Sequence, residues 1–127
     1  MFDLNNKTAI VTGGGSGIGR AIVKLFAQQG AAVHILDFDE NAAAAVAAEV
    51  LPVSGLVTAH GCDVSDQQMV SEVVETIFEK HKRIDVLVNN AGIAHIGNAE
   101  NTGEADFVRL FNVNVKGVYN MLHAVIP

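Results

Sequence analysis

The chain carries little that would suit it to disulfides, nucleic acids or membranes. Its 127 residues include one cysteine, which excludes an internal disulfide and suits a reducing compartment such as the cytoplasm. Lys and Arg number 8 against 14 Asp and Glu, and the net charge of −6 argues against a nucleic-acid partner, which needs clustered cations. No apolar run is long enough to span a bilayer, and the N-terminus shows no basic leader.

Metal-ligating residues are equally sparse. The five histidines form no pair at the helical spacing of metal ligands, and no second cysteine joins them, so we predict no metal site. Cys62 closes a buried strand pattern, where a packed thiol is favoured over a nucleophile.

Apolar residues make up 50% of the chain, which is compatible with one domain over residues 1–127 and a packed core. Strand-like runs occupy Thr8–Thr12, Ala32–Asp37, Leu56–Cys62 and Ile84–Asn89, with helical patterns between them. This alternation predicts an α/β fold with a parallel sheet, a Rossmann-type doubly wound domain of strand order 3-2-1-4. The chain stops after the helix that follows the fourth strand, and the ligand crevice is expected between strands one and four.

Helix ends are predicted from local signals. Gly30 is expected to end the first helix, because glycine is common just beyond helix ends. Ser65 with Gln68 forms a plausible capping box at the start of the third helix.

The most informative segment is Thr12–Gly19, which lies between the first strand and the first helix and contains five glycines. Glycines let a backbone approach a bulky pyrophosphate, and the helix that follows offers free N–H groups. A strand, a glycine turn and a helix in this order are typical of a dinucleotide-binding loop.

Four motifs give the chain a family resemblance. Thr12–Gly19 reads Thr-Gly-x-x-x-Gly-x-Gly, Asn89–Gly92 reads Asn-Asn-Ala-Gly, Asp63–Val64 follows the third strand, and Asn114 lies in the helix after strand four. In this order they resemble the N-terminal, cofactor-binding part of a classical short-chain dehydrogenase/reductase, over essentially the whole chain.

The resemblance implies an NAD cofactor and a set of contacts to it. The implied cofactor-binding residues are Gly13, Gly15, Ser16, Gly17, Ile18, Gly19, Asp37, Phe38, Cys62, Asp63, Val64, Asn90, Ala91 and Gly92.

Asp37 closes the second strand, where a carboxylate can accept hydrogen bonds from the adenosine ribose of NAD. Relatives that bind NADP usually carry a basic residue just after this position or before the second motif glycine, and here Phe38 and Ser16 stand there. We therefore expect NAD to be preferred. The alternative is that Asp37 only caps the next turn, a role for which Asp39 competes.

Asp63 and Val64 are implied to hold the adenine ring, by a polar contact to its amino group and an apolar contact to its face. The alternative is a helix-entry loop rich in capping residues. Asn90 has a structural interpretation as well, in which its amide ties neighbouring strands and loops to each other.

Asn114 shares a predicted apolar helix face with Phe111, Val118 and Met121, so its amide must find partners. It is either a core asparagine satisfied by backbone or, as the resemblance implies, part of a proton relay to a catalytic lysine. The catalytic Ser and Tyr-x-x-x-Lys pair are absent, because the only tyrosine, Tyr119, is followed four positions later by His123. We expect the 127-residue chain alone to be inactive.

The expected activity of the complete enzyme is hydride transfer between nicotinamide and a small alcohol or carbonyl substrate, in a homo-oligomer. An alternative is a non-catalytic dinucleotide-binding or partner-binding module, since strand four would leave one sheet edge unpaired. A methyltransferase or a phosphate-loop nucleotidase is disfavoured, because the motif spacing differs and Arg20 stands where the latter needs lysine.

Overall fold

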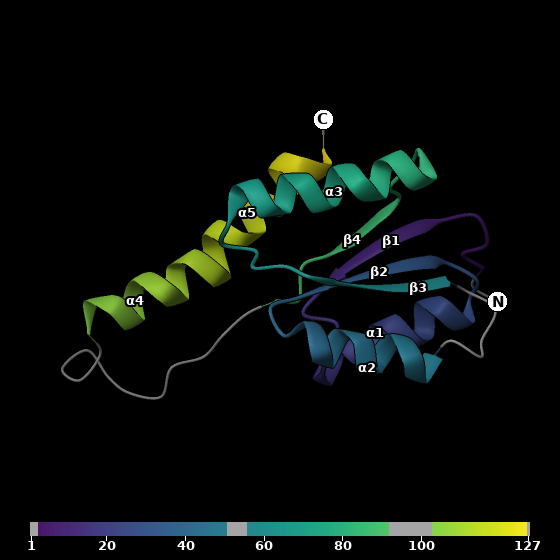
Figure 1. Cartoon of the computed structure of the whole chain (residues 1–127), viewed down its shortest axis with the longest axis horizontal. Coiled ribbons are helices and arrows are strands. Elements are labelled where there is room, and N and C mark those ends of the chain that lie inside the picture. Colours follow the sequence, from purple (N-terminus) through teal and green to yellow (C-terminus); the bar gives the residue numbers. More distant parts are fainter. Residues whose placement is uncertain (1–2, 51–55, 92–102, 127) are drawn as a thin grey trace.

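The computed structural model describes residues 3–50, 56–91 and 103–126, without the side chains of residues 106, 107 and 110. Strands and helices alternate along the chain as the sequence predicts (Figure 1). In chain order the elements are β1 (Thr8–Thr12), α1 (Gly17–Gln28), β2 (Ala32–Asp37), α2 (Glu40–Val50), β3 (Leu56–Gly61), α3 (Gln67–His81), β4 (Val86–Val88), α4 (Glu104–Phe111), the π-helix η1 (Asn112–Lys116) and α5 (Gly117–Val125).

The four strands form a parallel sheet in the order β3-β2-β1-β4, which confirms the predicted topology. Every residue of β1 is buried, as expected for an inner strand of a parallel sheet that is covered on both faces. Val11 pairs with Ile35 of β2 and Val88 of β4. Since β1 lies between β2 and β4, the segments that follow these three strands meet at one edge of the sheet.

Two helical layers cover the sheet, with α1 and α2 on one face and α3 and α5 on the other (Figure 1). Successive strand residues point to opposite faces, so Val11, Val33 and Ile35 pack against α1 and α2. Ile10 and Leu36 pack against α3 and α5. Among the residues described, no helix combines the length and the apolar character needed to cross a membrane.

The helix ends follow the sequence in one case and differ from it in another. Gly30 follows the end of α1 and takes a φ of +94°, which favours glycine, as predicted. The capping box of Ser65 and Gln68 is wrong. Asp66 caps α3 instead, because its carboxylate accepts from the N–H of Met69 at 3.1 Å, while the Ser65 hydroxyl donates to Asp63.

A row of three histidines lies on the α3 face of the sheet. His34 of β2 is only 3% exposed, and its Nδ1 lies 2.9 Å from Nε2 of His60, while its Nε2 lies 2.8 Å from Nε2 of His81. A neutral imidazole has one donor and one acceptor nitrogen, so neutral His34 can bond to both neighbours at once.

Protonation of His34 is strongly opposed by its surroundings. Burial, and then the nearby His60, His81 and Lys80, lower the pKa of His34 to about 3. Among the described residues no group of three or more His, Cys, Asp or Glu side chains could hold a metal ion, in keeping with the prediction from sequence.

Candidate functional site

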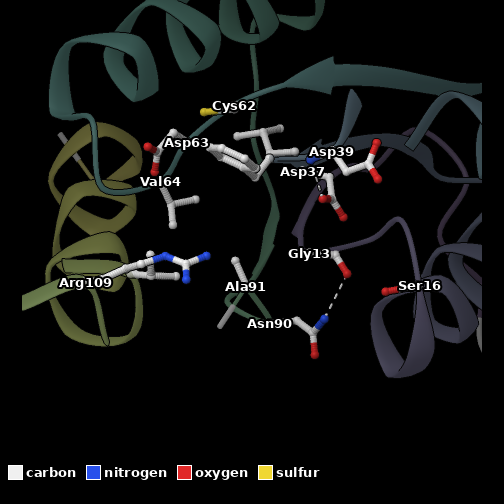
Figure 2. Close-up of a pocket in the computed structure, with 13 residues that line it drawn as sticks. Gly13, Ser16, Asp37, Asp39, Cys62, Asp63, Val64, Asn90, Ala91 and Arg109 are labelled. Carbon is white, nitrogen blue, oxygen red and sulfur yellow. Dashed lines mark hydrogen bonds between the residues drawn. The ribbon is translucent and has the colours of Figure 1, made fainter. Parts of the chain in front are cut away.

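A cavity of about 350 Å³ opens at the carboxyl ends of the strands, where the sequence places the ligand crevice. Figure 2 shows the side chains that surround it, contributed by the ends of β1, β2 and β3, the segment after β4, and α4 with η1. The lining residues are Gly13, Ser16, Leu36, Asp37, Phe38, Asp39, Cys62, Asp63, Val64, Asn90, Ala91, Arg109 and Val113.

The glycine turn forms one wall of the cavity and is tied to the segment after β4. Gly13 has a φ of +67°, and a Cβ there would come within 2.9 Å of the Cα of Ala91. The Asn90 side-chain amide donates to the carbonyl of Gly13 at 3.0 Å (Figure 2). The Thr12 hydroxyl oxygen accepts from the N–H groups of Asn90 and Ala91, each at 3.0 Å. The two loops therefore form one packed unit.

Asp37 lies at the end of β2 with its carboxylate already positioned by backbone groups. Its Oδ2 accepts from the N–H of Gly15 at 2.9 Å and its Oδ1 from the N–H of Asp39 at 2.9 Å. The cap of α2 belongs to Asp39, whose Oδ1 accepts from the N–H of Ala42 at 3.0 Å. The carboxylate of Asp37 is thus fixed at the cavity wall and retains lone pairs for a ligand.

The segment after β3 forms the opposite wall. Asp63 Oδ1 accepts from both the N–H and the hydroxyl of Ser65, at 3.0 and 2.6 Å, and the Val64 side chain is buried. Burial, and then Asp63 and Asp66, raise the pKa of the Cys62 thiol to about 11. Cys62 is therefore an uncharged packed thiol, which fits the prediction that it is not a nucleophile.

Val64 is held in place from α5. Asn120 is fully buried, donates from its amide to the Val64 carbonyl at 2.9 Å, and accepts from the Gln67 side chain at 3.2 Å. A Cβ on Gly117 would lie 2.5 Å from a Val64 methyl, so the helix backbone packs directly on this residue. The adjacent cavity wall is fixed by these contacts.

Comparisons with known proteins agree with this arrangement. A family profile described as short chain dehydrogenase matches residues 7–127. The chain belongs to the short-chain dehydrogenase family. The match covers all the elements described above, so the glycine turn and the cavity belong to this family's fold.

Individual relatives are about twice as long as this chain. A 3-oxoacyl-[acyl-carrier-protein] reductase of Thermotoga maritima is 40% identical over 124 residues, which cover 98% of this chain and 50% of the relative. A D-threitol dehydrogenase of Mycolicibacterium smegmatis is 36% identical over 124 residues, which cover 98% of this chain and 48% of that protein. The chain therefore spans about half the length of the curated relatives it matches.

A solved structure extends the comparison to three dimensions. The crystal structure of 3-ketoacyl-(acyl-carrier-protein) reductase from Brucella melitensis complexed with NADH matches with a TM-score of 0.90 and 41% identity. The match covers 98% of this chain and 51% of that one. The described sheet and helices are therefore arranged as in an oxidoreductase of this family.

The structure brings most of the predicted site residues to the cavity, but not all of them. The predicted residues that line it are Gly13, Ser16, Asp37, Phe38, Cys62, Asp63, Val64, Asn90 and Ala91. Gly15 and Gly17 line a shallower depression beside α1, Ile18 is 74% exposed, and Gly19 is buried under the glycine turn. Gly92 lies outside the described residues.

The predicted buried apolar face around Asn114 is wrong. Asn114 is exposed, and its neighbours Phe111 and Leu122 are 50% and 40% exposed. The prediction assumed a regular α-helix, whereas Asn114 lies within the π-helix η1, whose wider turns change which side chains share a face. Its role in a proton relay is not affected by this correction and stays a proposal.

Two residues that shape the site were not found by sequence reasoning. Asn120 gives no motif signal, because its partners Val64 and Gln67 are far away in sequence. Arg109 lines the cavity from α4, and only its spacing of one helical turn from Val113 could have pointed to it.

We expect Asn120→Ala to lower the free energy of unfolding by about 1–3 kcal/mol, because it leaves the buried carbonyl of Val64 without its donor. Urea denaturation measures the loss. Asn41→Ala, at an exposed position of α2, is the control and should change stability by less than about 0.5 kcal/mol. Equal stabilities of the two variants would contradict the assigned role of Asn120.

Proposed function

We propose that this chain is the cofactor-binding part of an NAD(H)-dependent oxidoreductase that interconverts an alcohol and a carbonyl group. The observation that carries the proposal is the Asp37 carboxylate, fixed at the cavity wall by Gly15 and Asp39. A carboxylate here suits the two hydroxyls of an adenosine ribose and repels the 2′-phosphate of NADP. Phe38 and Ser16 bring no cation to that phosphate.

The rest of the cavity fits the other parts of the dinucleotide. The pyrophosphate would lie at the glycine turn and the N-terminus of α1, where free N–H groups and the helix dipole favour negative charge. Asp63 would accept from the adenine amino group, Val64 would contact the ring, and the backbone at Asn90–Ala91 would lie against the ribose. The Brucella melitensis relative, described as a complex with NADH, supports the choice of cofactor class.

Hydride transfer is the chemistry that a bound nicotinamide supplies. The two named relatives are a reductase and a dehydrogenase, which supports an alcohol or carbonyl substrate for this chain's family. The sequence has no Tyr-x-x-x-Lys pair, so we propose that these residues alone bind NAD without turning it over, with Asn114 contributing to a proton relay only when a catalytic lysine is present. The buried, reduced Cys62 is compatible with a cytoplasmic location.

Asp37→Asn is expected to raise the Kd for NAD about tenfold and to reduce the preference over NADP, because the isosteric amide loses the charge that binds ribose hydroxyls and repels phosphate. Calorimetric titration with NAD and NADP measures both effects. Asp66→Asn removes the same charge outside the cavity and keeps a capping side chain, so it should leave both Kd values unchanged. Tighter binding of NADP than of NAD by the unaltered chain would rule out the proposed preference.

A partner-binding module is the second candidate, and an exposed apolar stripe along α4, η1 and α5 favours it. The stripe consists of Val108, Phe111, Val115, Tyr119, Leu122 and Ile126, each at least 40% exposed. A homo-oligomer that covers this stripe is compatible with both candidates. Titration with NAD separates them, because a module that binds only protein partners would show no binding heat.

A further inference from the structure

Arg109 stands out as a cation in a cavity lined by carboxylates. It projects from α4 beside Val113, and the same cavity is lined by Asp37, Asp39 and Asp63. Within the described part of the chain, Arg109 makes no hydrogen bond and no ion pair, although three acidic residues share its cavity. Its guanidinium is therefore available to a ligand.

The direction of the side chain narrows the choice of ligand group. Figure 2 shows the guanidinium of Arg109 reaching into the cavity between Val64 and Ala91, on the side away from Ser16. The pyrophosphate site at the glycine turn lies on the Ser16 side. Arg109 is thus placed near the end of the cavity where the base would lie, and not near the phosphates.

We propose that Arg109 lays its guanidinium plane on the adenine ring of the bound dinucleotide and closes the cavity over it. This inference rests on the proposed NAD function and adds a specificity-determining residue to it. A planar cation on the face of an aromatic ring is attracted by the ring electrons, and a guanidinium stacks better than an ammonium. Asp63 would hold the ring edge and Arg109 its open face, so the two contacts act on different parts of the base.

Arg109→Ala is expected to raise the Kd for NAD, ADP-ribose and AMP by the same factor of about 5, because all three carry adenosine. Arg109→Lys should recover part of the loss, since it restores the charge without the plane. Lys116→Ala removes one exposed cation from η1, outside the cavity, and should change none of these Kd values. Because Arg109 is exposed and unpaired within the described residues, the melting temperature of Arg109→Ala should stay at the level of the unaltered chain.

A double-mutant cycle with Asp63→Asn separates stacking from charge pairing. Stacking predicts that Arg109→Ala weakens ADP-ribose by the same factor with and without the Asp63 carboxylate. A loss that disappears in the Asp63→Asn background would show that Arg109 acts through that carboxylate, and would overturn the proposal. So would equal losses for Arg109→Ala and Lys116→Ala. If the unaltered chain binds neither ADP-ribose nor NAD, the proposed function itself fails, which is a distinct result.

Discussion

Gly19→Ala is expected to weaken NAD binding at least about 30-fold and to lower the free energy of unfolding by about 2–4 kcal/mol. The Cβ of alanine would collide with the carbonyl of Gly13 and come 2.5 Å from Nδ2 of Asn90. These two groups form the 3.0 Å hydrogen bond that ties the glycine turn to the segment after β4. The added methyl must break that bond or displace the turn, and either change deforms the wall against which a pyrophosphate would lie.

Gly103→Ala is the matched control for this substitution. Gly103 precedes α4, has a φ of −76°, and a Cβ there would meet nothing within 4 Å. Its substitution should leave both NAD affinity and stability near those of the unaltered chain. Calorimetric titration and urea denaturation of both variants measure the difference, and an unchanged Kd for Gly19→Ala would refute the packing argument.

The chain is expected to lose stability in mild acid because of His34. The pKa of His34 is lowered from 6.5 to about 3 by burial and by its cationic neighbours. A lowered histidine pKa means that the unfolded chain binds the proton more readily, so the stabilisation is complete above pH 6.5 and falls as the pH drops toward 3. The slope is about 1.4 kcal/mol per pH unit, which gives a loss of roughly 2–3 kcal/mol by pH 4.5.

The pH window separates this effect from that of the carboxylates. Hydrogen bonds from Arg20 and Lys24 lower the pKa of Glu49 from 4.5 to about 2, so any loss from Glu49 begins only below about pH 4.5. His34→Val should therefore flatten the profile between pH 6.5 and 4.5, measured by urea denaturation at half-unit steps. His123→Gln, at an exposed position on α5, should keep the slope of the unaltered chain. A His34→Val variant with the same slope would exclude His34 as its origin.

The sheet could be predicted from sequence because its signals are local. Burial of both strand faces makes β1 and β2 continuous apolar runs, and each strand is bounded by a glycine turn or a helical pattern. The third strand ends at Gly61 instead of Cys62, and the fourth covers only Val86–Val88. These differences are confined to the ends, where terminal residues lack a partner on the neighbouring strand.

The parts that sequence reasoning missed depend on pairs far apart along the chain. His34, His60 and His81 come from three different elements, and no local pattern shows that they meet. Asn120 is identified only by its bond to the Val64 carbonyl. The cap of α3 went to Asp66 because its carboxylate, rather than the Ser65 hydroxyl, faces the N–H of Met69. Adjacent capping residues are equivalent in sequence and are distinguished only by backbone direction.

The π-helix between α4 and α5 makes this part of the chain more sensitive to length than to composition. Residues four apart on an α-helix drift by about 40° per step, and the wider turn of a π-helix reduces that drift. It thereby keeps Val113 at the cavity and Gly117 on Val64, along one line of side chains. Deleting one residue from Asn112–Lys116 would rotate everything beyond it by about 100°. Relatives can therefore exchange side chains here freely, while insertions and deletions should be rare in this segment.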